Sequence, residues 1–250
     1  MRYTPKYFKD AMPEWKRKKD PPLSRIFYRP AGYVLATLFS NAGVSANTVS
    51  YLSIIEGIIA CVLLLPDHYG CRVAGAVLVN LWLVLDCTDG CIARGVKAQP
   101  FGEFVDGISS YIIVALLGIC MGMAVFSEGG LLVKPGCPWM ILAGALASVS
   151  DTLMRLIYQK FKAEEAALAE KGIIERVSDR RTDHQEVGSL RVKIEQDFGI
   201  GGILPVLVLL GCVFRALDLV LLYCLFYYGG SCMVVTISYI RKARKAEKRG

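Results

Sequence analysis

The feature that most constrains this chain is a series of apolar runs close to the length needed to cross a membrane. A spanning helix needs about 20 mostly apolar residues at 1.5 Å rise per residue. The candidate runs cover residues 48–66, 73–85, 101–126, 139–157, 200–214 and 217–239. The second run reaches a spanning length only if its helix continues through Asp86 and Asp89 to about Arg94. The sequence therefore predicts an all-α integral membrane protein built as a bundle of six transmembrane helices.

Composition supports this prediction and argues against other classes. Hydrophobic residues make up 54% of the 250 residues and charged residues 20%, with a formal net charge of +7. The charges are clumped between the apolar runs, which argues against a disordered or nucleic-acid-binding protein. The nine cysteines form no CxxC pair, and two histidines are too few to complete a zinc site with them.

The positions of lysine and arginine predict the orientation in the membrane. They are dense before the first run, between the fourth and fifth runs and after the sixth, and two lie between the second and third. Because such residues stay on the cytoplasmic side, both termini and the active site are expected to face the cytoplasm. Residues 1–30 are then a juxtamembrane segment, 31–240 the six-helix domain and 241–250 a basic tail. Within the first segment, residues 3–19 predict an amphipathic interfacial helix, and an unordered basic tail is the alternative.

Three carboxylates follow the second run closely. Asp86 and Asp89 stand three residues apart, so on a helix they project from one face. They lie at a helix end, where exposed carbonyls favour a cation. Asp106 lies just over one turn into the next predicted helix, which starts from the same side. We expect the three side chains to converge just inside the cytoplasmic boundary.

Clustered anions at this depth repel one another unless a cation binds them. Ligands that are all oxygen suit Mg²⁺ or Mn²⁺. Gly90 and Gly102 leave room for a nucleotide, and Arg94 offers a fork to a phosphate. Taken singly, each residue has an ordinary structural explanation as a solvated cap or a packing glycine. Together, in this order, they indicate a site for a diphosphate.

This segment, Asp86-x2-Asp89-Gly90-x2-Ala93-Arg94 followed by Gly102-x3-Asp106, resembles the motif of the CDP-alcohol phosphotransferases, D-x2-D-G-x2-A-R-x8-G-x3-D-x3-D. The resemblance implies a six-helix membrane enzyme with an N-terminal amphipathic helix, often a homodimer.

The resemblance also assigns residues. It implies that two Mg²⁺ or Mn²⁺ ions are held by Asp86, Asp89 and Asp106. The segment 45–49 is similar to the asparagine-containing start of the family's first helix. The nucleotide-binding set is accordingly Gly90, Ala93, Arg94, Gly102 and Asn47.

The chain departs from the family motif at two places. Seven residues rather than eight separate Arg94 from Gly102, and Ser110 stands where the family has its fourth aspartate. In the family that aspartate is a metal ligand and the base that activates the acceptor hydroxyl. Three explanations stay open: Glu103 substitutes as the base, the acceptor needs no side-chain base, or activity is lost. The catalytic set is thus Asp106, Glu103 and Ser110.

Other ionisable residues are weaker candidates. Glu56, in the middle of the first run, is either a protonated packing residue or a wall of the site. Asp151 and Arg155 are four residues apart on one helix, so they either satisfy each other or leave Arg155 to hold an acceptor phosphate. Arg191 and Lys193 are acceptor candidates by resemblance, with simple positive-inside residues as the alternative.

The sequence therefore predicts transfer of a substituted phosphate from a CDP-linked alcohol to an acceptor alcohol, with release of CMP, in phospholipid or related lipid or glycan synthesis. The expected partners are a CDP-linked donor, an acceptor alcohol, the lipid bilayer and a second copy of the chain, with no nucleic acid. The alternative is a catalytically impaired relative that binds nucleotide and metal or assists assembly.

Overall fold

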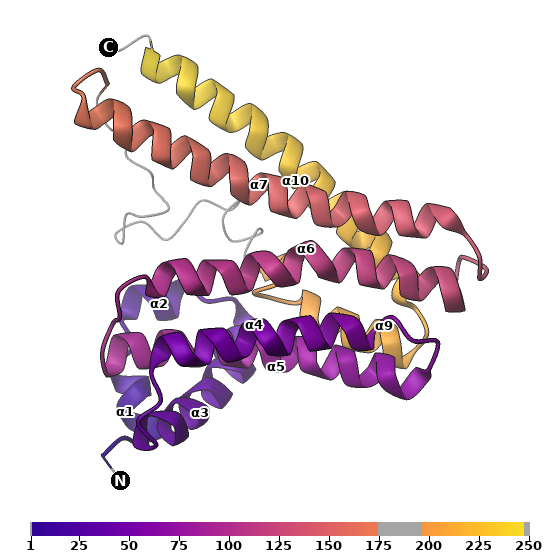
Figure 1. Cartoon of the computed structure of the whole chain (residues 1–250), viewed down its shortest axis with the longest axis horizontal. Coiled ribbons are helices and arrows are strands. Elements are labelled where there is room, and N and C mark those ends of the chain that lie inside the picture. The colour runs from indigo at the N-terminus through magenta and orange to yellow at the C-terminus, as the bar shows by residue number, and fades with distance from the viewer. Residues whose placement is uncertain (1, 175–196, 248–250) are drawn as a thin grey trace.

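The computed structural model describes residues 2–174 and 197–247, and this part of the chain is helical without a strand. The elements in chain order are α1 (Pro5–Asp10), α2 (Glu14–Lys19), the π-helical turn η1 (Ser24–Tyr28), α3 (Arg29–Asn41), α4 (Ala46–Leu63), α5 (Tyr69–Gly95), α6 (Gly102–Glu128), α7 (Pro138–Glu170), α9 (Leu204–Val213) and α10 (Leu217–Glu247) (Figure 1).

Five helices in the described ranges are long and apolar enough to cross a membrane, namely α4, α5, α6, α7 and α10. The protein is therefore an integral membrane protein. The prediction that the second span continues through Asp86 and Asp89 is confirmed, because α5 ends only at Gly95.

The sixth expected span is not confirmed. Residues 199–203 fold as turns, so the helix in this region, α9, starts only at Leu204 and has ten residues. At 1.5 Å per residue it rises about 15 Å, half the thickness of a hydrocarbon core. The glycines at 201 and 202, which are poor helix formers, account for the shortening.

The N-terminal segment also differs from the single interfacial helix expected over residues 3–19. It forms two short helices, α1 and α2, that are interrupted around Pro13. Phe8 of α1 is buried, and the Tyr7 hydroxyl donates a hydrogen bond of 2.5 Å to the carbonyl of Gly95. The next helix, α3, packs on α5 and crosses the expected domain boundary at residue 30.

The long helices approach closely at small residues, as is usual between helices in membranes. A Cβ at Gly75 of α5 would lie 2.7 Å from the Ala60 carbonyl oxygen of α4. A Cβ at Gly118 of α6 would lie 2.7 Å from the carbonyl oxygen of Gly144 in α7. These contacts set the spacing of α4, α5, α6 and α7 and therefore where their side chains meet.

A buried polar ladder joins α4, α5 and α6 near the predicted site. The indole nitrogen of Trp82 donates to the Ser109 hydroxyl at 3.0 Å, and the Ser53 and Ser109 hydroxyls are 2.8 Å apart. Hydrogen bonds between side chains in the membrane core fix the rotation of each helix about its axis. This register positions Asp86 and Asp89, which follow Trp82 on α5, and Asp106, which precedes Ser109 on α6.

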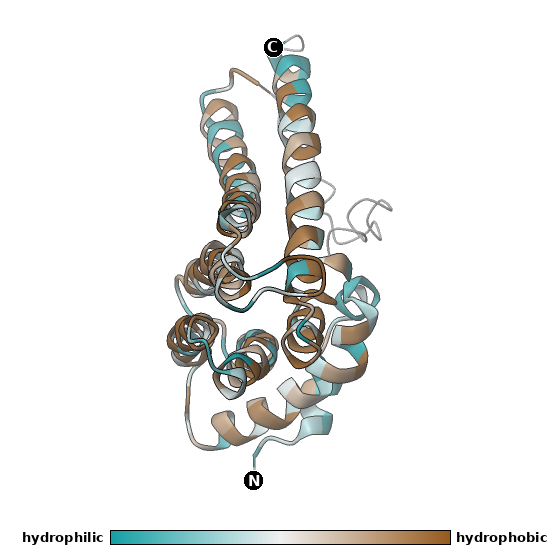
Figure 2. Cartoon of the chain, turned by 90° about the vertical axis from the view of Figure 1, so that its right-hand side faces the viewer, coloured by the Kyte–Doolittle hydropathy of each residue, from teal (hydrophilic) through white to brown (hydrophobic). Residues whose placement is uncertain are grey.

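Helix α1 and the last turns of α10 lie at the same end of the molecule as the turn between α5 and α6 (Figure 1). Seen from the side, α7 and α10 extend together away from the other helices (Figure 2). Buried Arg72 ties the opposite end of α5 to Glu128 at the end of α6 and to Asp67.

Candidate active site

One cavity, which we call the Asp89 cavity, opens where the start of α4, the end of α5 and the start of α6 meet. Its volume is about 670 Å³. Ser45 caps α4 by accepting a hydrogen bond from the Thr48 amide at 3.2 Å, and Phe101 precedes α6 in the left-handed region at φ 57°. Predicted residues lining it are Asn47, Asp89, Gly90, Ala93, Arg94, Gly102, Glu103 and Asp106. The structure thus brings the whole predicted nucleotide-binding set around one space.

The glycines of the Asp89 cavity are explained by what lies over them. A Cβ at Gly90 would come within 2.8 Å of Nη2 of Arg94, so the guanidinium rests on the bare backbone of the preceding turn. A Cβ at Gly102 would lie 3.3 Å from Oδ1 of Asn47. Both positions therefore need a small residue if Arg94 and Asn47 are to keep these orientations.

Asn47 links the start of α4 to the loop before α6. Its side-chain amide donates to the Pro100 carbonyl at 3.2 Å, and its backbone amide donates to Oε1 of Gln99 at 3.2 Å. Its Oδ1 is buried and has no hydrogen-bond partner within the described residues. Because such an atom is costly to leave unpaired, it is available as an acceptor for a ligand in the cavity.

A second cavity, which we call the Asp86 cavity, lies about one turn earlier along α5 and has a volume of about 290 Å³. Its residues come from α2, η1 and α3, from α5, α6 and α7, and from the segment before α9 and the middle of α10. The charged or hydroxyl-bearing side chains that line it are Lys16, Lys19, Asp20, Ser24, Arg29, Asp86, Ser110, Asp151, Arg155, Tyr227 and Tyr228.

Asp86 and Asp106 connect the two cavities. Their carboxyl groups are hydrogen-bonding partners, although Asp86 lines one cavity and Asp106 the other. The charge of Asp89 interacts with both, and its Oδ2 accepts a hydrogen bond of 2.5 Å from the Ser50 hydroxyl. The three predicted metal ligands are therefore neighbours at the boundary between the cavities.

The donor set fits a hard divalent cation in type, since it consists of carboxylate oxygens that repel one another without a positive charge between them. Within the described ranges no three His, Cys, Asp or Glu side chains are already arranged to hold an ion. Asp89 is turned to Ser50, while Asp86 and Asp106 face each other.

The wall of the Asp86 cavity that comes from the N-terminal segment was not anticipated from the sequence. Asp20, which is 6% exposed, accepts hydrogen bonds from Arg29 at 2.8 and 3.1 Å and pairs with Lys16 at 3.2 Å. Burial opposes the charged form of Asp20, but the hydrogen bond and charge of Arg29, with Lys16, outweigh it and hold the pKa of Asp20 below its ordinary value. No local sequence signal marks this pair, since neither residue belongs to a motif.

The other predicted candidates are Arg155, Glu56, Arg191 and Lys193. Arg155 donates from Nε to Oδ1 of Asp151 at 2.9 Å, so the two pair as the local interpretation expected, and both line the Asp86 cavity. Both carboxylate oxygens of Glu56 are buried without a partner in the described part of the chain. Arg191 and Lys193 lie outside the described residues.

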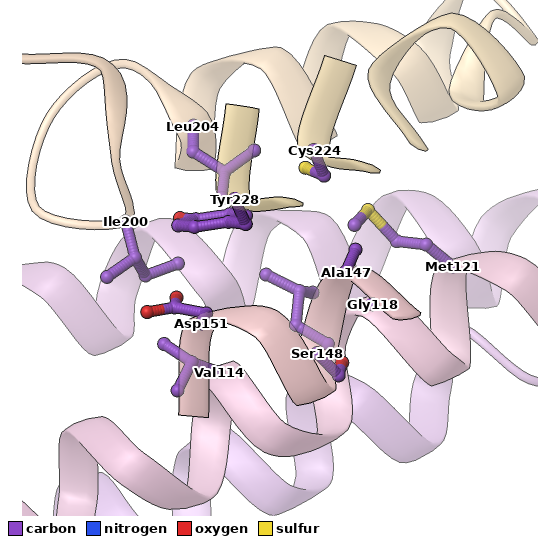
Figure 3. A pocket seen from close by; sticks show the side chains of 11 residues that line it. Val114, Gly118, Met121, Ala147, Ser148, Asp151, Ile200, Leu204, Cys224 and Tyr228 are labelled. Atoms are coloured by element: carbon purple, nitrogen blue, oxygen red, sulfur yellow. The ribbon is translucent and has the colours of Figure 1, made fainter. Parts of the chain in front are cut away.

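A small space next to the Asp86 cavity is shown in Figure 3. It has a volume of about 20 Å³ and is lined by α6, α7, α10 and the segment before α9. Asp151 reaches it from α7 and lies beside the ring of Tyr228 from α10. The Tyr228 hydroxyl is buried, and the Asp151 carboxylate is the polar group with which it interacts.

Comparison with known proteins supplies the family. No curated protein matches the chain. A model of the CDP-alcohol phosphatidyltransferase family matches residues 43–175, which include α4 to α7 and all the residues of the aspartate motif. With this match over more than half of its length, the chain belongs to the CDP-alcohol phosphatidyltransferase family of transferases.

Proposed function

We propose that this protein transfers a substituted phosphate from a CDP-linked alcohol to an acceptor alcohol and releases CMP, in phospholipid or related lipid or glycan synthesis. The observation that carries the proposal is the contact of Asp86 with Asp106 at the boundary between two cavities. A transferase of this kind needs a donor and an acceptor to meet at one phosphorus atom. The two cavities meet at the carboxylates of Asp86 and Asp106, so a donor in one and an acceptor in the other can reach the same phosphorus atom.

In this proposal the Asp89 cavity receives the CDP group. Arg94 offers its guanidinium fork to a phosphate, and the unpaired Oδ1 of Asn47 accepts a hydrogen bond from the donor. Asp86, Asp89 and Asp106 would hold Mg²⁺ or Mn²⁺, which would neutralise charge on the transferring and leaving phosphates. Family membership supports this metal requirement.

The Asp86 cavity receives the acceptor. Arg155 is the described candidate for an acceptor phosphate, and Lys16 and Lys19 add positive charge to the same wall. We also propose that the active site faces the cytoplasm together with both termini. Helix α1 and the last turns of α10 lie at the same end of the molecule as the α5–α6 turn, which supports this orientation (Figure 1). A homodimer stays a prediction, to be checked by light scattering of the purified protein.

The test is metal-dependent release of CMP by the purified protein in lipid nanodiscs. Donors would include CDP-diacylglycerol and CDP-glycerol, and acceptors would include polyols, polyol monophosphates and diacylglycerol. We expect CMP release that requires Mg²⁺ or Mn²⁺ and an acceptor, and that is lost in Asp86→Asn. Release that persists without divalent metal would contradict the proposal.

One observation favours a second candidate function, a nucleotide-binding relative without transferase activity. Ser110 occupies the position where the family motif has its base, and a general base is worth about 10²–10⁴-fold in rate. CDP binding that raises the unfolding temperature, together with no CMP release for any donor and acceptor pair, would establish this second function in place of the first.

A further inference from the structure

We propose that Asp151 of α7 takes the proton of the acceptor hydroxyl, in the role that the family motif gives to an aspartate at the position of Ser110. This inference rests on the transferase function proposed above. The carboxylate that the motif lacks on α6 is then supplied by the neighbouring helix.

Asp151 and Ser110 line the same cavity from neighbouring helices. Ser110 lies one turn beyond Asp106 on α6, and its side chain lines the Asp86 cavity. Asp151 lines the same cavity from α7, which crosses α6 closely at Gly118 and Gly144. The charge of its partner Arg155 also acts on Asp86, so the Asp151–Arg155 pair lies within electrostatic reach of the metal-binding carboxylates.

The other nearby carboxylates either have another role or partner, or line the other cavity. Of the described carboxylates that line the Asp86 cavity, Asp86 belongs to the metal-binding set and Asp20 is held by both Arg29 and Lys16. Asp151 forms an ion pair with Arg155 through Oδ1 and interacts with the Tyr228 hydroxyl, and its Oδ2 lies outside the ion pair. Glu103 is exposed and lines the Asp89 cavity, which is assigned to the donor.

The surroundings of Asp151 also suit an acceptor hydroxyl. Asp151 is 2% exposed, so a proton shared with it is shielded from bulk water. The Tyr228 hydroxyl is buried beside it and interacts with the Asp151 carboxylate, so it can donate a hydrogen bond to Asp151 or to the acceptor oxygen (Figure 3). Arg155 fixes the orientation of the carboxylate, as the partner of a general base commonly does.

In the proposed step one phosphorus–oxygen bond forms, one breaks, and a proton passes to Asp151. The acceptor oxygen forms a bond to the phosphorus that carries the donor's alcohol, and its proton passes to Oδ2 of Asp151. The bond between that phosphorus and the bridging oxygen breaks, and CMP leaves with the electron pair. Asp151 then releases its proton to solvent through the Asp86 cavity.

The experiment compares wild type, Asp151→Asn, Ser110→Asp and the double variant Ser110→Asp/Asp151→Asn in the CMP-release assay described above. We expect Asp151→Asn to lower kcat by about 10²–10⁴-fold, with the donor KM and the stabilisation by Mg²⁺ unchanged. The double variant should recover most of the lost rate, because the carboxylate returns on α6 at the motif position. Glu164→Gln, an exposed carboxylate on the same helix, serves as the matched control and should keep wild-type activity.

Full activity in Asp151→Asn would overturn the inference while leaving the transferase function intact. A loss in Asp151→Asn that the double variant does not restore would also overturn it, since it would show a structural role for the ion pair. A loss confined to Glu103→Gln would assign the base to the donor side instead. If the wild type releases no CMP with any pair of substrates, the proposed function fails and this inference fails with it.

Discussion

The guanidinium group of Arg94 lies on the backbone of Gly90, one turn earlier on α5, so closely that a Cβ there would be 2.8 Å from Nη2. The contact keeps the guanidinium on the wall of the Asp89 cavity, where it can reach a phosphate.

Gly90→Ala should therefore weaken nucleotide binding without harming the fold. The added methyl group displaces the Arg94 fork, and a charged hydrogen bond is worth about 1.5–3 kcal/mol, or about 10–100-fold in Kd. Alanine stabilises a helix interior by about 0.5–1 kcal/mol relative to glycine, so the unfolding temperature should stay the same or rise. Titration calorimetry with CDP measures the first effect. Gly107→Ala, with open space around its Cβ, is the control and should keep the wild-type Kd.

Because three carboxylates lie close together, replacing one of them should have opposite effects on the unfolding temperature with and without metal. Asp106→Asn removes a charge that faces Asp86, so the metal-free variant should unfold at the same or a higher temperature than wild type. The rise in unfolding temperature that Mg²⁺ gives to wild type should be lost. Thermal unfolding in EDTA and in Mg²⁺ checks both effects. An Asp106→Asn variant that Mg²⁺ stabilises as strongly as wild type would remove Asp106 from the ligand set.

The Asp20–Arg29 pair predicts a pH dependence in the acidic range. The pKa of Asp20 is below its ordinary value of 3.8. The stabilisation from its ionised form is thus fully present above that value and is lost as the pH falls through the folded pKa. Asp20→Asn leaves Arg29 buried without its partner, which costs about 3–5 kcal/mol at neutral pH.

The deficit of Asp20→Asn relative to wild type should shrink as the pH falls below 3.8, because wild type loses the same ion pair. Urea unfolding at a series of pH values measures it, with Asp10→Asn at an exposed position as the control. A deficit that is constant across the acidic range would show that the charge of Asp20 does not provide the stabilisation.

The close crossing of α6 and α7 predicts a strong effect of a single methyl group. A Cβ at Gly118 would lie 2.6 Å from the Ser148 hydroxyl and 2.7 Å from the Gly144 carbonyl oxygen. Gly118→Ala should destabilise the protein by about 1–3 kcal/mol through overpacking. Gly230→Ala, whose Cβ would meet nothing within 4 Å, should have no such effect in the same unfolding assay. Equal stabilities of the two variants would contradict this packing.

Residues close in sequence made the Asp89 cavity predictable. Asp89, Gly90 and Arg94 follow one another on one helix, and Gly102 comes just after the next turn, so spacing alone brings them together. The length of α5 was also predictable from neighbouring residues. Its apolar run reaches a spanning length only if the helix continues through Asp86 and Asp89.

Contacts between distant segments escaped prediction. Arg29 reaches the carbonyl of Cys87 on α5, 58 residues away, and no periodicity encodes that approach. The placement of Asp151 beside the acceptor space depends on how α7 crosses α6, which Gly118 and Gly144 decide through backbone contact. Helix α9 is short because residues 199–203 form turns. The apolar run in the sequence indicates that these residues avoid water, but it does not indicate where the helix begins.

The last turns of α5 supply residues to both cavities, with Asp86 and Cys87 lining one and Asp89, Gly90 and Arg94 lining the other, further along the helix. A residue inserted between Asp86 and Asp89 would rotate everything beyond it by about 100° and turn Asp89 away from the face that it shares with Asp86. Residues 96–101, which join α5 to α6 without helix, impose no such angular requirement. The one-residue difference from the family spacing falls in that connection, where it leaves the relative orientation of Asp86, Asp89 and Arg94 on α5 unchanged.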